Sequence, residues 1–362
     1  MRRLFTRLLF AVPLILSLTA QAQDIHFSQF YSAPLLLNPA MTGNVAESYR
    51  VALSYRNQWA SIPAPYSTVA ASVDASLLGC QLGVDHVGVG LAISNDRSGD
   101  GLLNDFTSML SLAYHKGLDP ERRYMLSLGG QVGYTQKSID ITKLLFERQI
   151  DPNLELNSAL PNGEPFQNNR FDYIDLRAGG MFTGALNENA NVYLGGSFYH
   201  LTKPQETFLT PEASSAEKNL LDPRLVFHGG GSFNLGTRFN LSPSMIYMSQ
   251  SGSRNIVVGT AFGYSFQERA RRYSRGRGGR SSRGNSEQGS ALYLGSWYRM
   301  NDAVILLLGI DYQSFKFGFS YDINVSGLRQ ATLSQGAVEL ALSFTGKMAE
   351  CKREVPTYCP RF

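Results

Sequence analysis

The feature that most constrains this chain is an alternation of apolar residues with polar or small ones, which recurs in about fourteen short segments. The clearest case, residues 87–94, places Val, Val, Leu and Ile on one face and Gly, Gly, Ala and Ser on the other. A period of two is that of a β-strand, because successive side chains point to opposite faces. Gly, Ser and Thr recur on the second face, and aromatic residues lie near the segment ends. The pattern therefore favours a sheet closed on itself, with lipid outside and water or small side chains inside.

Fourteen segments are predicted as antiparallel strands of an all-β transmembrane barrel. Their length of about ten residues matches a tilted membrane strand. They cover residues 49–58, 67–77, 86–95, 105–116, 123–137, 172–184, 191–201, 224–234, 238–249, 254–266, 291–298, 303–312, 315–322 and 337–345. Pro243 falls inside one of them. Because proline lacks a backbone N–H, we expect it at a strand end or a bulge.

The first 22 residues have the three parts of a secretory signal peptide. Three arginines (Arg2, Arg3 and Arg7) precede an apolar stretch over residues 8–18, and Ala20-Gln21-Ala22 forms a small-x-small cleavage site. Beyond it the longest strongly apolar run is 303–310, far short of the ~20 residues that a helical span needs. The chain is therefore expected to be exported, either as an outer-membrane barrel or as a soluble β-sandwich or propeller.

An even number of strands predicts how the connections are divided between the two sides of the membrane. With both termini on the periplasmic side, the two longest connections (138–171 and 202–223) face outward, and most inward connections are short. The exception is an inward, Arg-rich loop over residues 267–289. The expected organisation is a signal peptide (1–22), an N-terminal plug or periplasmic segment (23–48), a barrel (49–345) and a periplasmic tail (346–362).

The Arg-rich loop is the candidate docking site for a partner. It holds seven arginines and two glutamates, a net charge of +5. It is either a flexible basic loop without a partner or an electrostatic docking arm for an acidic periplasmic protein or an anionic lipid surface. Arginine–glycine segments also bind RNA, but export argues against a nucleic-acid partner. The candidate docking residues are Arg269, Arg271, Arg272, Arg275, Arg277, Arg280 and Arg283.

Catalysis finds little support in the sequence. The five histidines are scattered without metal-ligand spacing, and no nucleophile elbow or phosphate loop occurs. We therefore predict a non-enzymatic protein without a catalytic residue, metal or cofactor. Asp175 and Arg177 share an inward face and are expected to form part of a charge network in the lumen, and His115 and Asp74 also fall on inward faces.

Three cysteines, Cys80, Cys351 and Cys359, leave room for one disulfide in an oxidising compartment. All three pairings are open, with a slight preference for one that involves the tail.

The segment before the first strand, residues 24–44, carries apolar residues that need cover. It is predicted to pack in the lumen or across the periplasmic mouth, which leaves no open pore. A passive channel or transporter for small or hydrophobic solutes is the rival interpretation. The candidate plug residues are Phe27, Phe30, Leu35, Leu36 and Leu37.

Several stretches resemble the PorP/SprF family. Residues 23–43 contain Gln-Asp-Ile-His-Phe-Ser-Gln-Phe-Tyr and then Leu-Asn-Pro-Ala-Met-Thr-Gly, which is similar to the opening signature of that family. Further matches are Tyr-Arg-Asn-Gln-Trp at 55–59 with the prolines at 63 and 65, Trp-Tyr-Arg at 297–299, Tyr-Asp at 321–322 and the ending at 336–344. The resemblance covers essentially the whole chain after the signal peptide, but not the Arg-rich loop.

The resemblance implies an outer-membrane protein of Bacteroidetes that takes part in type IX secretion and, in some members, gliding motility. Its implied partners are the outer-membrane lipid, periplasmic ring and lipoprotein subunits, and the C-terminal domain of a secreted cell-surface adhesin. A general machine component and a dedicated adhesin exporter or anchor remain alternatives. Adjacent genes for ring subunits would favour the first, and an adjacent gene for a giant adhesin the second.

Overall fold

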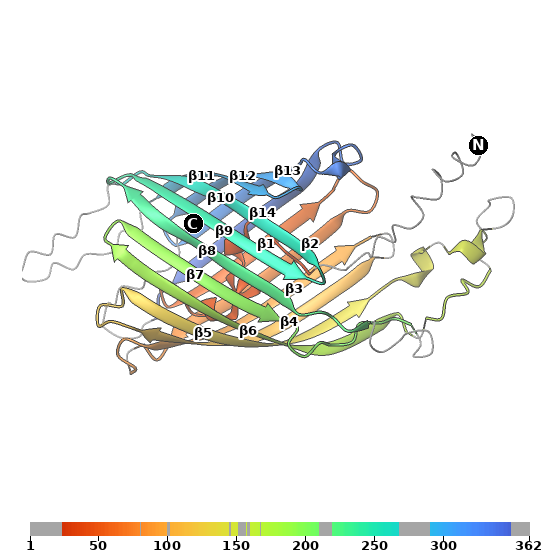
Figure 1. The fold of residues 1–362 in the computed structure, drawn as a ribbon, viewed down its shortest axis with the longest axis horizontal. Helices are drawn as coiled ribbons and strands as arrows, with labels where there is room; N and C mark the ends of the chain where they lie inside the picture. The colour runs from red at the N-terminus through yellow and green to blue at the C-terminus, as the bar shows by residue number, and fades with distance from the viewer. Residues whose placement is uncertain are drawn as a thin grey trace, which may run out of the picture.

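The computed structural model describes residues 24–348 except 80, 100–101, 145, 151–156, 158–159, 167, 210–218 and 268–289. Fourteen antiparallel strands close into one barrel, in which β1 pairs with both β2 and β14 (Figure 1). The strands are β1 Tyr49–Gln58, β2 Tyr66–Leu77, β3 His86–Ser98, β4 Leu103–Gly117, β5 Tyr124–Ser138, β6 Arg170–Asn187, β7 Ala190–Tyr199, β8 Arg224–Leu235, β9 Phe239–Gln250, β10 Ser253–Ser265, β11 Ala291–Arg299, β12 Ala303–Tyr312, β13 Phe315–Asn324 and β14 Gln335–Gly346. The predicted all-β barrel of fourteen antiparallel strands is confirmed, and each predicted strand overlaps one of these.

The outer face of the barrel is apolar and the inner face is small or polar. On β4 and β5, Leu110, Leu112 and Leu128 are each at least 60% exposed and point outward. The residues between them on the same strands, such as Ser111 and Ser127, are buried on the inner face. Exposed leucines at such density indicate a surface covered by lipid rather than water.

Aromatic residues gather near both ends of the outer face. Phe315 and Phe344 lie 4.9 Å apart between ring centroids where β13 begins and β14 ends, and Trp59 and Tyr66 lie 5.3 Å apart at the opposite end. Aromatic girdles at both interfaces are typical of membrane barrels. Within the described residues, no helix is long and apolar enough to span a membrane.

The two ends of the barrel differ in their connections. At one end, called here the long-loop end, lie the connections 139–169 and 200–223 (Figure 1, right). At the other, the tail end, β1 begins and β14 ends, and the connections include the two-residue turn 313–314. The helical turns η4 (Ile141–Lys143) and η5 (Glu147–Gln149) belong to the long-loop end, as does η7 (Gly327–Arg329).

Pro243 lies in the interior of β9 rather than at its end. The register between β8 and β9 runs to Gly230–Ser244 and resumes at Phe233–Leu241, so the pairs between them are absent from the ladder. The missing N–H of Pro243 explains this gap. The expected place at a strand end is therefore wrong, although the ladder is interrupted beside this proline.

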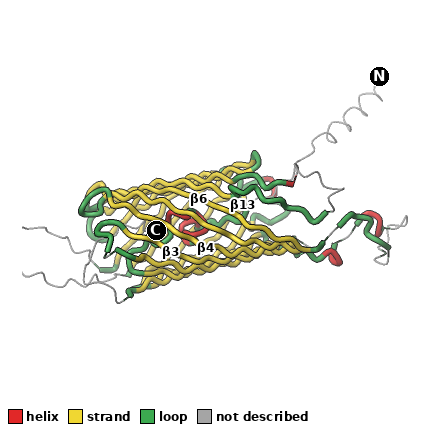
Figure 2. The backbone as a smooth tube through the Cα atoms, turned by 90° about the horizontal axis from the view of Figure 1, so that it is seen from below, coloured by secondary structure: helices red, strands yellow, loops and turns green. Residues whose placement is uncertain are grey.

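The N-terminal segment (residues 24–48) runs along the inside of the barrel from the long-loop end to the tail end (Figures 1 and 2). It contains three short helical turns: η2 Phe30–Ser32, α2 Pro34–Leu37 and η3 Pro39–Met41. Proline starts both α2 and η3, and Asn38 between them is extended, with φ −160° and ψ 124°, as expected before a proline.

The first described residue and the end of the last strand lie at opposite ends of the barrel. Asp24 contacts His200 and Arg224 at the long-loop end, whereas Gly346 pairs with Tyr49 at the tail end. This differs from the expectation that both ends of the chain lie on the periplasmic side. An even strand count fixes only that β1 begins where β14 ends, and the N-terminal segment crosses the lumen before β1 begins.

Candidate functional site

The inner wall binds the main chain of the N-terminal segment along its length. The carboxylate of Glu339 accepts hydrogen bonds from the backbone N–H groups of Ser28 (2.6 Å) and Gln29 (2.9 Å). The wall residues that bond to main-chain atoms of the segment are Arg50, Asp74, His115, Gln131, Ser197, Tyr199, Arg224, Gln250 and Glu339. Buried backbone N–H and C=O groups need hydrogen-bond partners. The wall side chains supply the partners that a regular helix or strand would otherwise provide.

Asn38 ties the middle of the segment to β6, β7 and β8. Its side chain is fully buried, and Nδ2 donates to the carbonyl oxygens of Gly180 (3.1 Å) and Gly196 (3.2 Å). Nδ2 also lies 3.0 Å from Nε2 of His228, while Oδ1 accepts from the N–H of Ala40 and so caps η3. One amide side chain thus fixes both the local turn and its place in the lumen.

Apolar side chains of the segment fill the lumen around these polar contacts. Of the five candidate plug residues, Phe27, Phe30, Leu35 and Leu37 are buried and Leu36 is partly buried. Phe30 and Leu37 pack in one cluster with wall residues of β6 to β12, among them Trp297. The inner face bears glycine where the segment passes closest: a Cβ on Gly88 would lie 1.9 Å from the carbonyl oxygen of Thr42.

A buried cluster of four charged side chains holds the segment near the long-loop end. Arg56 pairs with Glu339 and, at 3.5 Å, with Asp322, and Arg299 pairs with Asp322 at 3.0 Å. The Ser28 hydroxyl donates to Asp322 (2.7 Å) and accepts from Arg56 (2.7 Å). Two guanidinium groups balance two carboxylates, so the charges are compensated in a place with little water.

A second cluster at the same end includes a charge of the segment itself. Asp24 Oδ2 lies 2.6 Å from His200 Nε2 and 3.5 Å from Arg224 Nη1. The other ring nitrogen of His200, Nδ1, lies 3.0 Å from Asp175 Oδ2, which also accepts from Arg177 Nε at 3.0 Å. The Asp175–Arg177 pair expected from their shared inward face is therefore present, within a larger network.

The charges of this second cluster stabilise one another. Burial alone disfavours the imidazolium, but Asp24 and Asp175 outweigh it and raise the pKa of His200 to about 9. Burial also opposes the Asp24 carboxylate, yet His200 and Arg224 hold its pKa far below the ordinary value. Burial and the charges of Arg299 and Arg56 keep the pKa of His26 well below its usual range, so His26 stays neutral.

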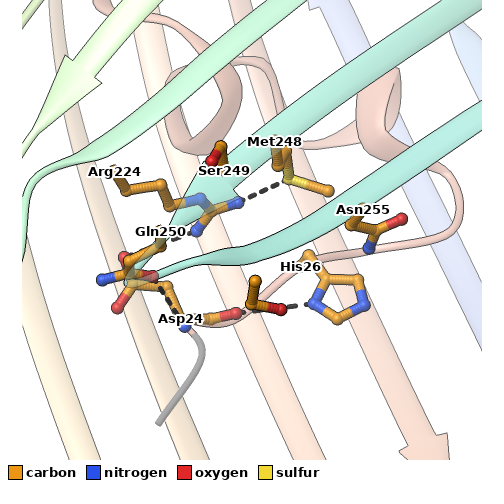
Figure 3. Close-up of a pocket in the computed structure, with 8 residues that line it drawn as sticks. Asp24, His26, Arg224, Met248, Ser249, Gln250 and Asn255 are labelled. Carbon is orange, nitrogen blue, oxygen red and sulfur yellow. Dashed lines mark hydrogen bonds and ion pairs between the residues drawn. The ribbon is translucent and has the colours of Figure 1, made fainter. Parts of the chain in front are cut away.

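A small pocket lies beside Asp24 (Figure 3). It is lined by Asp24, His26, Arg224, Gln250 and Asn255, among others, and has a volume of about 30 Å³. This is room for one or two water molecules, not for an organic substrate. Among the described residues no group of three or more His, Cys, Asp or Glu side chains could hold a metal ion.

The remaining predicted residues have different outcomes. His115 and Asp74 face the lumen and bind the segment, at Thr42 O (2.7 Å) and Gly43 N (2.7 Å). The candidate docking residues, the three cysteines and the predicted signal peptide lie outside the described residues; they are Arg269, Arg271, Arg272, Arg275, Arg277, Arg280 and Arg283, Cys80, Cys351 and Cys359, and residues 1–22.

Sequence reasoning missed the Arg56–Glu339–Asp322–Arg299 cluster. A signal for it exists, because each of these charges occupies an inward position of an alternating strand, where small or neutral residues prevail. All four charges also fall within stretches that resemble the family pattern. Charged residues on inward faces of separate strands, considered together, would have indicated a lumen network.

Comparisons with known proteins give one family. The family model described as "Type IX secretion system membrane protein PorP/SprF" matches residues 19–344. No curated protein matches the chain. Among solved structures, the Pseudomonas putida toluene transporter TodX is 9% identical with a TM-score of 0.47, covering 89% of this chain and 94% of that one. A Pseudomonas aeruginosa FadL homologue is 9% identical (TM-score 0.45; 85% and 92% covered), and the CymD monoaromatic hydrocarbon channel is 11% identical (TM-score 0.43; 88% and 94% covered).

Proposed function

Because this chain belongs to the PorP/SprF family of type IX secretion system membrane proteins, we propose that it is a non-enzymatic outer-membrane component of that system. In this role the barrel is closed along its axis by residues 24–44, which act as a plug. It couples to periplasmic machinery, or it exports or anchors a large cell-surface adhesin.

One observation carries the closed state: nine wall residues bond to the main chain of residues 24–44, which lie inside the barrel. An open channel for small solutes needs a continuous aqueous path, and buried residues such as Leu35 and Asn38 occupy that path. The observation argues against a permanently open channel, which is one form of the rival interpretation.

The proposed orientation puts the long-loop end outside the cell and the tail end in the periplasm. The two connections 139–169 and 200–223 at one end, and mostly short turns at the other apart from the connection 266–290, support it, since membrane barrels turn tightly on the periplasmic side. The Arg-rich loop (267–289) and the tail (346–362) follow β10 and β14, which end at the tail end. These two stretches would meet periplasmic ring or lipoprotein subunits, and the long loops would meet the C-terminal domain of an exported adhesin.

Replacing the seven candidate docking arginines by Ser is expected to abolish secretion while the barrel still assembles. The reason is that an electrostatic contact with an acidic partner needs the charge of the loop, not its length. The measurement is export of a type IX client from a strain in which the variant replaces the chromosomal gene, with heat-modifiable migration as the check on folding.

The matched control replaces the same seven residues by Lys, which keeps the charge and should retain export. If the Ser variant secretes as well as the native chain, the loop is not a docking site. If a strain without the whole chain exports all its clients normally, the proposed function itself is wrong.

A further inference from the structure

The part of the N-terminal segment that closes the barrel in the proposed function contributes one charged side chain to its contacts with the wall. Within residues 24–44 the only acidic or basic side chains are Asp24 and His26, and His26 is neutral. The Asp24 carboxylate is about a quarter exposed and lies at the long-loop end, against His200 and Arg224. Its contacts with the wall are therefore both ionic and reachable from that end of the barrel.

His200 connects the segment to the wall as a bridge between two carboxylates. It places one ring nitrogen 2.6 Å from Asp24 and the other 3.0 Å from Asp175. A neutral imidazole carries only one N–H, so a carboxylate oxygen beside each nitrogen favours the doubly protonated ring. The side chain of His200 is 3% exposed, so water does not compete for either contact.

The other elements packed around His200 contribute both signs of charge. Arg177 on β6 and Arg224 on β8 both lie over the Tyr199 ring, at 5.0 and 5.3 Å from its centroid. Farther out, the charged or titratable groups whose fields reach Asp24 are Lys137, Asp105 and Tyr173.

We propose that Asp24, His200, Asp175 and Arg224 form an ionic lock, and that breaking it releases residues 24–44 from the long-loop end. The inference rests on the proposed function, in which the segment closes the barrel, and it names how that closure is regulated. Release begins at the end opposite the periplasmic subunits, on the side where the exported client would dock.

The test measures how often the segment leaves its site in the purified protein. Ala33 is a small, buried residue of the segment, and Ala33→Cys in a chain whose three native cysteines are replaced by Ser reacts with a maleimide only when the segment opens. Asp24→Asn and His200→Gln should each increase the labelling rate roughly 10- to 100-fold, since each removes a hydrogen bond to a charged group. Heat-modifiable migration checks that the barrel stays folded.

The matched controls make the same kind of charge change at residues that are not part of the lock. Asp172 and Arg254 lie exposed on the outer face near the long-loop end, so Asp172→Asn and Arg254→Gln should label at the native rate. If Asp24→Asn and His200→Gln label no faster than these controls, the lock does not exist. If both label faster and secretion of the client does not change in cells, the lock stands and the closed state has no role in secretion.

The pH dependence gives an independent readout. The pKa of His200 is raised from its ordinary 6.5 to about 9 in the folded protein, so its stabilising effect is complete below pH 6.5 and is lost as the pH rises through 9. The ratio of labelling rates, His200→Gln over native, should be high at pH 6.5 and approach one above pH 9. A ratio that stays constant over this range would overturn the role given to His200.

Discussion

Replacing Gly129 by Val is expected to expel the N-terminal segment from the lumen. Gly129 faces inward on β5, and a Cβ there would lie 2.4 Å from the carbonyl carbon of Pro39, 2.5 Å from its oxygen and 2.6 Å from Ala40 N. All three are backbone atoms, which cannot move aside as a flexible side chain would. The segment and a valine at this position therefore exclude each other.

Gly130→Val is the matched control for this substitution. Gly130 is the next residue on the same strand and faces outward, where a Cβ would meet nothing closer than Arg177 O at 3.8 Å. Chymotrypsin digestion of the folded proteins should cut Gly129→Val after Phe27 or Phe30 and leave these two sites uncut in both Gly130→Val and the native chain, as read by mass spectrometry. Equal protection of the two variants, with both barrels folded, would show that the contact does not hold the segment.

Glu339→Gln is expected to destabilise the folded barrel by about 3–5 kcal/mol, the usual cost of removing one partner from a buried ion pair. Glu339 is 1% exposed, pairs with Arg56 and accepts hydrogen bonds from the backbone N–H groups of Ser28 and Gln29. Glutamine preserves the volume but leaves two buried guanidinium groups with Asp322 as the one buried carboxylate beside them, since Asp302, which pairs with Arg299, is partly exposed. The measurement is the free energy of unfolding in urea, with the protein in lipid vesicles.

Two controls test whether the loss of stability comes from a buried, unpaired charge. Lys116, whose side chain is half exposed, pairs with Asp85 at 2.9 Å at the tail end, and Lys116→Met should cost far less stability than Glu339→Gln, because solvent screens an exposed pair. The double variant Arg56→Met/Glu339→Met should recover much of the lost stability, because it removes both charges together. A loss for Glu339→Gln as small as that for Lys116→Met would mean that the cluster is not electrostatically coupled.

The strands could be predicted because their signal is local. A lipid-facing side chain every second residue leaves the same pattern in each strand, whatever its partner. Strand ends were less accurate: β6 runs from Arg170 to Asn187, beyond the predicted 172–184. The alternation of apolar residues stops at the edge of the lipid, but the hydrogen-bonded ladder continues past it.

The path of the N-terminal segment and the lumen clusters could not be derived in the same way. Ser28 and Glu339 are 311 residues apart in the chain, and no periodicity links them. The apolar residues of the segment indicate that it needs cover, but not which wall supplies it. That Asp24 lies at the long-loop end depends on His200 and Arg224, residues that appear unrelated in the sequence.

The central claim, that residues 24–44 close the barrel, is tested most directly by single-channel conductance in planar lipid bilayers. The purified full-length protein should show no steady conductance, and a variant lacking residues 24–44 should open stable channels. A steady conductance of the full-length protein that the deletion leaves unchanged would contradict the claim.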